Sequence, residues 1–214
     1  DFKAIGKDKP EAIMPGVKSV DWWENSINAS KAARQFVIDN FALYSSYGSD
    51  SWGLSAVQKP DGNYEGGYGA LPTDQGFAFH DGTIAPYSSI STIAFFKYED
   101  NGNLSSNLGF MALRYFNDTY FSSLWGKYGP KSSFNSLNQF SNSYLGIEQG
   151  PIIGMIENYR TGFIWQQFLK NEKIKAALKK VFECPNGICD PSPIICYNEL
   201  DCGEDRLIGD NFCT

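Results

Sequence analysis

Two glutamates lie in an otherwise apolar segment, residues 146–165, which reads GIEQGPIIGMIENYRTGFIW. A carboxylate can take a proton from water, accept hydrogen bonds or pair with a cation, but it is costly to bury without a partner. The apolar run from Pro151 to Leu169 predicts a buried helix that begins at the proline. Glu148 and Glu157 therefore need separate explanations.

Glu148 immediately precedes this expected helix start, between Gly146 and Gly150. One interpretation is a capping carboxylate, because the free N–H groups and the dipole of a helix N-terminus favour negative charge. The other is a reactive carboxylate at a loop-to-helix junction that faces a pocket. We favour the second, which makes Glu148 a candidate catalytic residue.

Glu157 lies within the expected helix, on the face it shares with Ile153, Ile164 and Phe168. We expect that face to be buried, and a lone buried carboxylate is costly. Arg160, three residues further on, or a group on a neighbouring helix is the expected partner. For Glu157 we favour the structural interpretation.

The two glutamates should not form a catalytic pair. Nine residues of helix span ~13 Å and place the ends on opposite sides. Carboxyl pairs that hydrolyse glycosidic bonds lie roughly 5–9.5 Å apart, so Glu148 needs a partner from elsewhere. The candidates are Asp81, Asp50 and Glu24. Asp81 is the best placed, after a long aromatic loop and before a helix, although an Asp before Gly is more often a turn residue.

Other chemistries find little support in the sequence. The single histidine, His80, has no Ser or Cys elbow motif near it, and a zinc site would need more ligands, so we expect no metal and no cofactor. A net charge of −6, without a run of Lys or Arg longer than a pair, argues against nucleic acid. No apolar stretch is long enough for a membrane span. The aromatic content of 15%, mixed with Gly, Ser and Asn, suits either sugar binding or an aromatic core.

All the cysteines lie in the last 31 residues: Cys184, Cys189, Cys196, Cys202 and Cys213. Their spacing among Pro, Gly, Asp and Asn, without CxxC pairs or His, predicts a disulfide-rich tail at 184–214. The odd number leaves one thiol unpaired or bonded to another chain. We expect a secreted or cell-surface protein, because disulfides persist in oxidising compartments.

The apolar periodicity predicts helices joined by long aromatic loops. The expected helices cover residues 20–44, 87–96, 105–121, 151–169 and 171–182, and the loops cover 51–82 and 124–146. No segment alternates convincingly enough for a strand, so the expected fold is all-α with its active loops at one end. We divide the chain into an extended lead-in at 1–19, a helical domain at 20–183 and the Cys-rich tail.

Several ordered motifs extend over about Asp21 to Phe182: DWWENS, RQFVIDN, SDSWGLSA, PDGNYEGGYGALP, HDGTIAPYSSIST, ALRYF, LWGKYG and the segment quoted above. In this order they resemble the bacterial glucoamylase-like family that includes endo-β-1,2-glucanases. The resemblance implies an (α/α)6 toroid of helical hairpins that binds sugar across one end and hydrolyses it with inversion.

The resemblance also implies an incomplete toroid, because the motifs are those of the family's C-terminal half. Glu148 stands where the family more usually has Asp in a GIDQGP motif, and it would be the general base. The general acid would lie in the N-terminal half that is missing here. By resemblance, the residues lining or bracing the sugar cleft would be Trp52, Tyr68, Asp81, Trp125, Tyr128, Gln149, Glu157 and Arg160.

Three hypotheses follow. The first is a secreted hydrolase of β-glucan, with a β-1,2 linkage expected, in which Glu148 activates water and Asp81 or a lost segment supplies the acid. The second is a non-catalytic carbohydrate-binding or assembly module made from half of the fold. The third is that the chain is part of a longer gene product. A half toroid exposes apolar helix surface, so another chain or self-association is expected to complete it.

Overall fold

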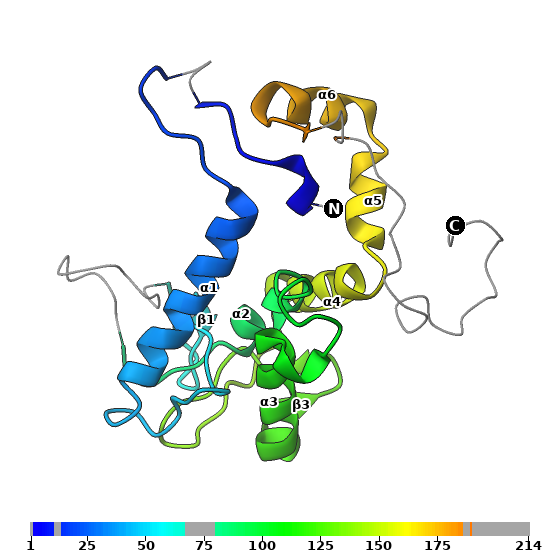
Figure 1. The fold of residues 1–214 in the computed structure, drawn as a ribbon. Coiled ribbons are helices and arrows are strands. Elements are labelled where there is room, and N and C mark those ends of the chain that lie inside the picture. Colours follow the sequence, from blue (N-terminus) through cyan, green and yellow to red (C-terminus); the bar gives the residue numbers. More distant parts are fainter. Residues whose placement is uncertain (1, 11–13, 67–79, 186–188, 190–214) are drawn as a thin grey trace. The chain divides into compact units, whose positions relative to one another are not determined.

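The computed structural model describes residues 2–10, 14–66, 80–185 and 189 (Figure 1). The chain forms two compact units. One comprises Asp1–Ser26 and Glu157–Thr214, and the other comprises Ile27–Ile156. This division differs from the domain boundaries expected at residues 19 and 183, which stay predictions.

The described part of the chain is mainly helical (Figure 1). The helices are η1 Phe2–Ile5, α1 Trp22–Asp39, α2 Pro86–Ile90, η3 Ser91–Ala94, η4 Leu104–Ser106, α3 Leu108–Leu124, α4 Gly146–Arg160, α5 Phe163–Leu169 and α6 Glu172–Val181. Two short antiparallel ladders accompany them, β1 Val57–Gln58 with β2 Tyr64–Glu65, and β3 Trp125–Gly126 with β4 Gly129–Pro130. The expectation of an all-α class is confirmed.

Helix α1 ends at Asp39, five residues before the expected end. Asp21 caps its start, because its Oδ1 accepts a hydrogen bond from the N–H of Glu24 at 3.0 Å. At the other end the Phe36 carbonyl accepts from both the backbone N–H of Asn40, at 3.2 Å, and the Asn40 side chain, at 2.8 Å. Phe41 and Leu43, which follow the helix, are exposed, so the apolar pattern there did not mark further helix.

The short helices and α3 are joined by a buried polar cap. The Asn107 side chain accepts from the N–H of Phe110 at 3.1 Å and donates to the Ile93 carbonyl at 3.0 Å and to Asp100 at 2.9 Å. This fixes the start of α3 three residues later than expected. Gly109 allows a close approach here, because a Cβ on it would lie 2.6 Å from the Ile93 nitrogen.

The core of the Ile27–Ile156 unit is aromatic. Phe116 and Phe134 are fully buried with ring centroids 5.7 Å apart, and Tyr120 lies 4.8 Å from Phe134. Phe134 also exchanges backbone hydrogen bonds with Ile84, whose loop is thereby held on the core. The long segments between helices are therefore structured where they are described, as expected.

The single helix expected at 151–169 is two helices. Helix α4 begins at Gly146, because the N–H groups of Glu148 and Gln149 already bond to the Leu145 carbonyl at 2.9 and 3.0 Å. It ends before Gly162, whose φ of 67° is left-handed and separates α4 from α5. Glu148 therefore lies in the first turn of α4 and does not precede the helix.

The expected burial of one face of this segment is wrong. Ile153 is 67% exposed, and Ile164 and Phe168 on α5 are exposed as well. Their apolar character satisfied the pattern of a buried helix, but the chain provides no cover for them among the residues described. Burial depends on what packs against a face, which periodicity does not specify.

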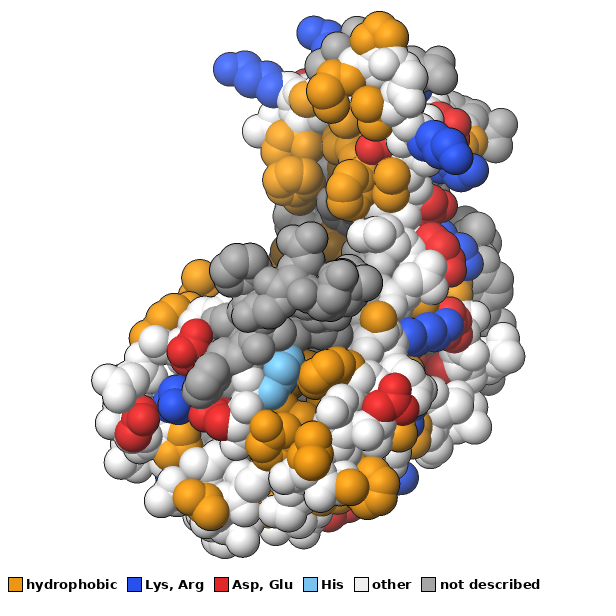
Figure 2. Space-filling model, turned by 90° about the vertical axis from the view of Figure 1, so that its left-hand side faces the viewer, with side chains coloured by type: hydrophobic (Ala, Val, Ile, Leu, Met, Phe, Trp, Pro, Cys, Tyr) orange, Lys and Arg blue, Asp and Glu red, His pale blue; other side chains and the backbone are white. Residues whose placement is uncertain are grey.

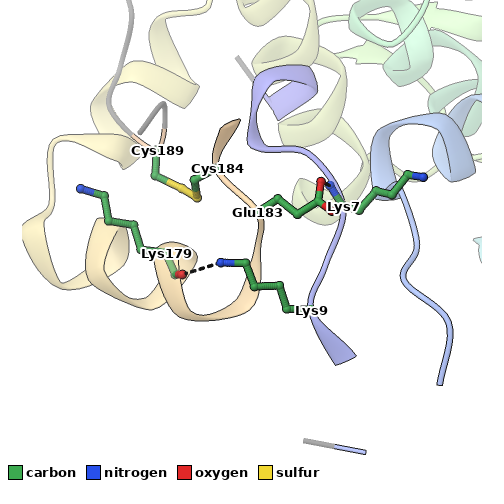
Figure 3. Close-up of a disulfide and its surroundings, with 6 residues drawn as sticks. All are labelled: Lys7, Lys9, Lys179, Glu183, Cys184 and Cys189. Atoms are coloured by element: carbon green, nitrogen blue, oxygen red, sulfur yellow. Dashed lines mark hydrogen bonds between the residues drawn. A yellow bond between two sulfur atoms is a disulfide. The ribbon is translucent and has the colours of Figure 1, made fainter. Parts of the chain in front are cut away.

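In the other unit, N-terminal residues pair with residues 181–184, after α6. Asp8 forms a bridge with Phe182, and its carboxylate accepts from the Val20 N–H at 2.7 Å and from the Trp22 indole at 2.8 Å. Close by, Cys184 and Cys189 form a disulfide (Figure 3), so a disulfide is present in the tail.

The same strand-like pairing holds Lys7 and Lys9 against the C-terminal segment. Lys9 donates to the Lys179 carbonyl at 3.3 Å, and the Lys7 N–H donates to the Glu183 carboxylate at 3.3 Å (Figure 3). The sequence suggested no partner for these residues, because the contacts join residues 170 and 176 positions apart. Among the helices described, none combines the length and the apolar character needed to cross a membrane.

Candidate active site

Glu148 is a buried carboxylate at the start of α4. Its side chain is 2% exposed. Oε1 accepts a hydrogen bond from the Ser132 hydroxyl at 2.6 Å, whereas buried Oε2 has no hydrogen-bond partner among the described residues. A buried polar atom without a partner is uncommon and often marks a site of chemistry. The fold therefore sets Glu148 apart from a helix-capping glutamate.

Ser132 connects this carboxylate to the first ladder. It follows β4 and is itself buried, and its Oγ accepts a hydrogen bond from the backbone N–H of Gln58 at 2.9 Å. The adjacent Ser133 donates to the carbonyl of the same Gln58 at 2.6 Å. The Ser132 N–H bonds in turn to the Ser143 carbonyl at 2.9 Å, so the segment is held on several sides.

The environment of Glu148 favours the protonated form. Burial raises the pKa of Glu148 above its usual range, and the hydrogen bond from Ser132 partly opposes this. Burial also raises the pKa of Tyr87 on α2; the bond from this phenol to Ser55 opposes the shift, and the charge of Glu148 adds to it. A carboxyl tuned upwards in this way is suited to proton transfer near neutral pH.

The β3–β4 hairpin presents aromatic surface next to the start of α4. Gln149 donates to the Pro130 carbonyl at 2.7 Å, which ties the hairpin to α4 one residue after Glu148. Tyr128 at the turn is 61% exposed and lies edge-on to Tyr144, with ring centroids 5.8 Å apart. An exposed ring of this kind offers a flat face on which a sugar can stack.

The two tryptophans expected to line the cleft, Trp52 and Trp125, are less exposed than Tyr128. Trp52 is fully buried in the aromatic core, and Trp125 in β3 is partly buried. The indole N–H of each is buried without a hydrogen-bond partner in the described part of the chain. Tyr68 lies outside the described residues. The sugar-contacting roles of these three residues stay predictions.

Asp81 has the contacts of a turn residue. Its Oδ1 accepts from the N–H of Thr83 at 3.0 Å, and its Oδ2 lies 3.3 Å from the Lys59 ammonium. Both carboxylate oxygens of Asp81 therefore have partners, a backbone N–H and a lysine. The contacts therefore support the structural alternative. The catalytic role of Asp81 stays a prediction.

His80 lies next to this turn in an aromatic setting. Its ring centroid is 4.4 Å from that of Phe36, and its Nδ1 is 3.4 Å from the Tyr47 hydroxyl. Burial, more than the charges of Tyr44 and Asp81, raises the pKa of the Tyr47 phenol. Figure 2 shows the single histidine at the surface, with hydrophobic side chains beside it. These contacts favour a packing role for His80 over a catalytic one.

Glu157 and Arg160 belong to the other unit, where they form the expected pair. Arg160 Nη1 lies 3.5 Å from Glu157 Oε2, and the Thr161 hydroxyl donates to Glu157 Oε1 at 2.5 Å. Of the other carboxyls considered for the acid, Asp50 has a buried Oδ1 without a hydrogen-bond partner in the described residues, and Glu24 lies in the first turn of α1. No acid is identified by these contacts.

Sequence reasoning missed Ser132 and Tyr87. Both are ordinary residues in their local sequence, sixteen residues before Glu148 in the first case and far away in the second. Nothing in their spacing signals that Ser132 bonds to Glu148 or that the charge of Glu148 acts on Tyr87. The fold alone brings them to the carboxylate.

Solved structures of glucanases resemble this chain in fold. The chain is mainly helical and matches part of the helical toroid fold of solved glucanases. An endo-β-1,2-glucanase from Chitinophaga pinensis, solved with sophorotriose and glucose, matches 76% of this chain with a TM-score of 0.63 and 30% identity. A β-1,2-glucanase from Parabacteroides distasonis matches 84% of this chain with a TM-score of 0.66 and 26% identity.

The family follows from the sequence match. The Glycoamylase family model, described as "Putative glucoamylase", matches residues 9–172, and the chain belongs to this family. A curated relative from P. distasonis, an exo β-1,2-glucooligosaccharide sophorohydrolase acting at the non-reducing end, is 30% identical over 165 residues, or 77% of this chain. The chain spans 21% of that relative's length. It spans 35% of the C. pinensis and 22% of the P. distasonis structure.

Proposed function

We propose that this chain carries the general base of a secreted, inverting glycoside hydrolase that acts on β-1,2-glucan. The single observation that carries this proposal is the buried Glu148 with one satisfied and one unsatisfied oxygen. The β-1,2-glucan activities named for the relatives support the substrate. Family membership and the relatives support a glycoside hydrolase-like role.

In this mechanism, Glu148 takes a proton from water. Ser132 keeps its hydrogen bond to Oε1, so Oε2 is the atom that accepts the proton as the water oxygen attacks the anomeric carbon. The leaving oxygen is protonated by a separate carboxylic acid. By the family resemblance that acid comes from outside the matched half. The ion pair of Asp81 with Lys59 favours the turn-residue interpretation of Asp81 over a role as this acid.

We further propose that a second polypeptide segment, on another chain or on a second copy, covers the exposed apolar residues of the Ile27–Ile156 unit. The exposed residues include Phe121, Leu137, Ile147 and Ile153. Large apolar side chains left in water on one fold are typical of an interaction surface.

The extracellular location is supported by the Cys184–Cys189 disulfide. Disulfides form and persist mainly in secreted, periplasmic and surface proteins, because the cytosol keeps thiols reduced. Expression with a secretion signal, followed by thiol counting before and after reduction, tests this. A disulfide that forms only on air oxidation would argue against the proposed location.

The second candidate is a non-catalytic carbohydrate-binding module, favoured by the exposed Tyr128 platform beside α4. A single experiment separates the two. Reducing-end release from linear β-1,2-glucan is measured for the parent chain, for Glu148→Gln and for Glu172→Gln, a control at an exposed glutamate of α6. β-1,3- and β-1,4-glucan serve as substrate controls.

Hydrolysis by the parent and by Glu172→Gln but not by Glu148→Gln supports the proposed enzyme. We expect the loss at Glu148 to be at least about a hundredfold, as for removal of a general base. Binding of the glucan without hydrolysis by the parent supports the module. Equal hydrolysis by Glu148→Gln and the parent would rule out Glu148 as the base.

A further inference from the structure

Ser132 has a hydrogen-bond arrangement that determines where its proton points. Its Oγ already accepts from the N–H of Gln58 at 2.9 Å, and its oxygen lies 2.6 Å from Glu148 Oε1. A serine hydroxyl has one hydrogen to donate. That hydrogen is therefore directed to Glu148, and the backbone of β1 fixes the direction.

We propose that Ser132 is a positioning residue that holds Oε1 of Glu148 and leaves Oε2 as the atom that reacts with water. The inference rests on the proposed function, because it assigns the orientation of the same base. It also names a residue that neither the family motifs nor the sequence pattern indicated.

The support of Ser132 is rigid, which a positioning role requires. Gln58 pairs with Tyr64 in the β1–β2 ladder, and its carbonyl accepts a second hydrogen bond from Ser133 at 2.6 Å. Ser132 therefore bonds to the N–H of Gln58, and Ser133 bonds to its carbonyl. Only Ser132 passes this constraint on to Glu148.

The groups around Glu148 suit this role. Tyr87, the other polar group whose titration Glu148 affects, directs its phenol to Ser55 at 2.7 Å and to the Ala56 carbonyl at 3.0 Å. Its proton is therefore engaged elsewhere. The hydrogen bond from Ser132 acts against the burial that raises the pKa of Glu148, so losing it should raise that pKa further.

The test compares Ser132→Ala with Ser133→Ala in the full chain, and Ser132→Thr restores the hydroxyl. Ser133 is a matched control because it is equally buried and also bonds to Gln58, but its partner is the carbonyl and not Glu148. The first readout is the pH titration of the Glu148 carboxyl carbon by NMR of glutamate-labelled protein, with the signal assigned from Glu148→Gln. The second is the pH profile of kcat/KM on linear β-1,2-glucan.

We expect Ser132→Ala to move the Glu148 titration and the acid limb of the kcat/KM profile together to higher pH. On the acid side kcat/KM should fall roughly tenfold, the scale expected for one hydrogen bond to an ionised group. Ser133→Ala should lower thermal stability without moving either curve, and Ser132→Thr should restore both. If Ser132→Ala does not fold, Ser132→Cys keeps the volume with a weaker donor and takes its place.

An unchanged Glu148 titration in Ser132→Ala, or a shift of equal size in Ser133→Ala, would overturn the positioning role while leaving the proposed hydrolase untouched. If Ser132→Ala shifts the Glu148 titration but the parent chain hydrolyses no glucan, the hydrogen-bond assignment stands and the proposed function is overturned. The two failures are therefore distinguishable.

Discussion

Glu148→Gln should make the protein more stable at neutral pH while abolishing its proposed activity. The ionised carboxylate is buried with Oε2 unsatisfied, which is unfavourable in the folded state. Glutamine has nearly the same shape, and its carbonyl oxygen can still accept the hydrogen bond from Ser132. The substitution therefore removes the charge without removing the one observed contact.

The expected magnitude follows from the cost of a buried polar atom without a partner, about 1–3 kcal/mol. The glutamine amide would itself lack a partner at the Oε2 position, so we expect a net gain of about 1–2 kcal/mol at pH 7.5. For a chain of this length each kcal/mol corresponds to a Tm change of about 2–4 °C. The variant should melt roughly 2–8 °C above the parent.

The gain should depend on pH in a defined direction. Because burial raises the pKa of Glu148 in the folded state, the folded protein binds the proton more tightly than the unfolded chain. The parent therefore loses stability as pH rises from the unfolded pKa, about 4.3, through the folded pKa. The advantage of Glu148→Gln should be complete above that range and close to zero near pH 3.5.

Differential scanning fluorimetry or calorimetry between pH 3.5 and 8 provides the measurement. Glu157→Gln is the control, since Glu157 is on the same helix but is half-exposed and paired with Arg160 and Thr161. It should be neutral or slightly destabilising at pH 7.5. A Glu148→Gln variant that is less stable than the parent at pH 7.5, or whose advantage is constant with pH, would refute the account of Glu148 as a desolvated carboxylate.

Four further substitutions check the packing by thermal or urea denaturation. Gly162→Ala should destabilise the protein by about 1 kcal/mol, because the φ of Gly162 is left-handed. Gly154→Ala should stabilise it by about 0.5–1 kcal/mol, because a Cβ there lies in open space within α4. The same sign for both substitutions would contradict the assigned helix break. Gly109→Ala should cost about 1–3 kcal/mol, because its Cβ would meet the backbone of Ile93 at 2.6 Å, and a neutral result would show that α3 and η3 are less close. Phe116→Ala should cost about 3–5 kcal/mol, and a loss below about 1 kcal/mol would argue against the aromatic core.

Periodicity and composition were sufficient for the helical class but not for helix limits. The pattern around Pro151 predicted one buried helix, yet hydrogen bonds to the Leu145 carbonyl start α4 earlier and Gly162 ends it. The apolar residues of this segment identified a face that can be buried. They carried no information on whether another element covers it, because that element lies elsewhere in the chain or outside it.

For the candidate site, the sequence by itself identified Glu148, because a carboxylate in an apolar run is an exception that local chemistry makes visible. It also indicated the pairing of Glu157 with Arg160, since residues three apart on a helix are neighbours. Only the tertiary structure decided that Ser132 and Tyr87 accompany Glu148 and that Lys59 pairs with Asp81. Those interactions join segments distant in sequence, and their geometry is set by the packing of loops on the aromatic core and not by any local spacing.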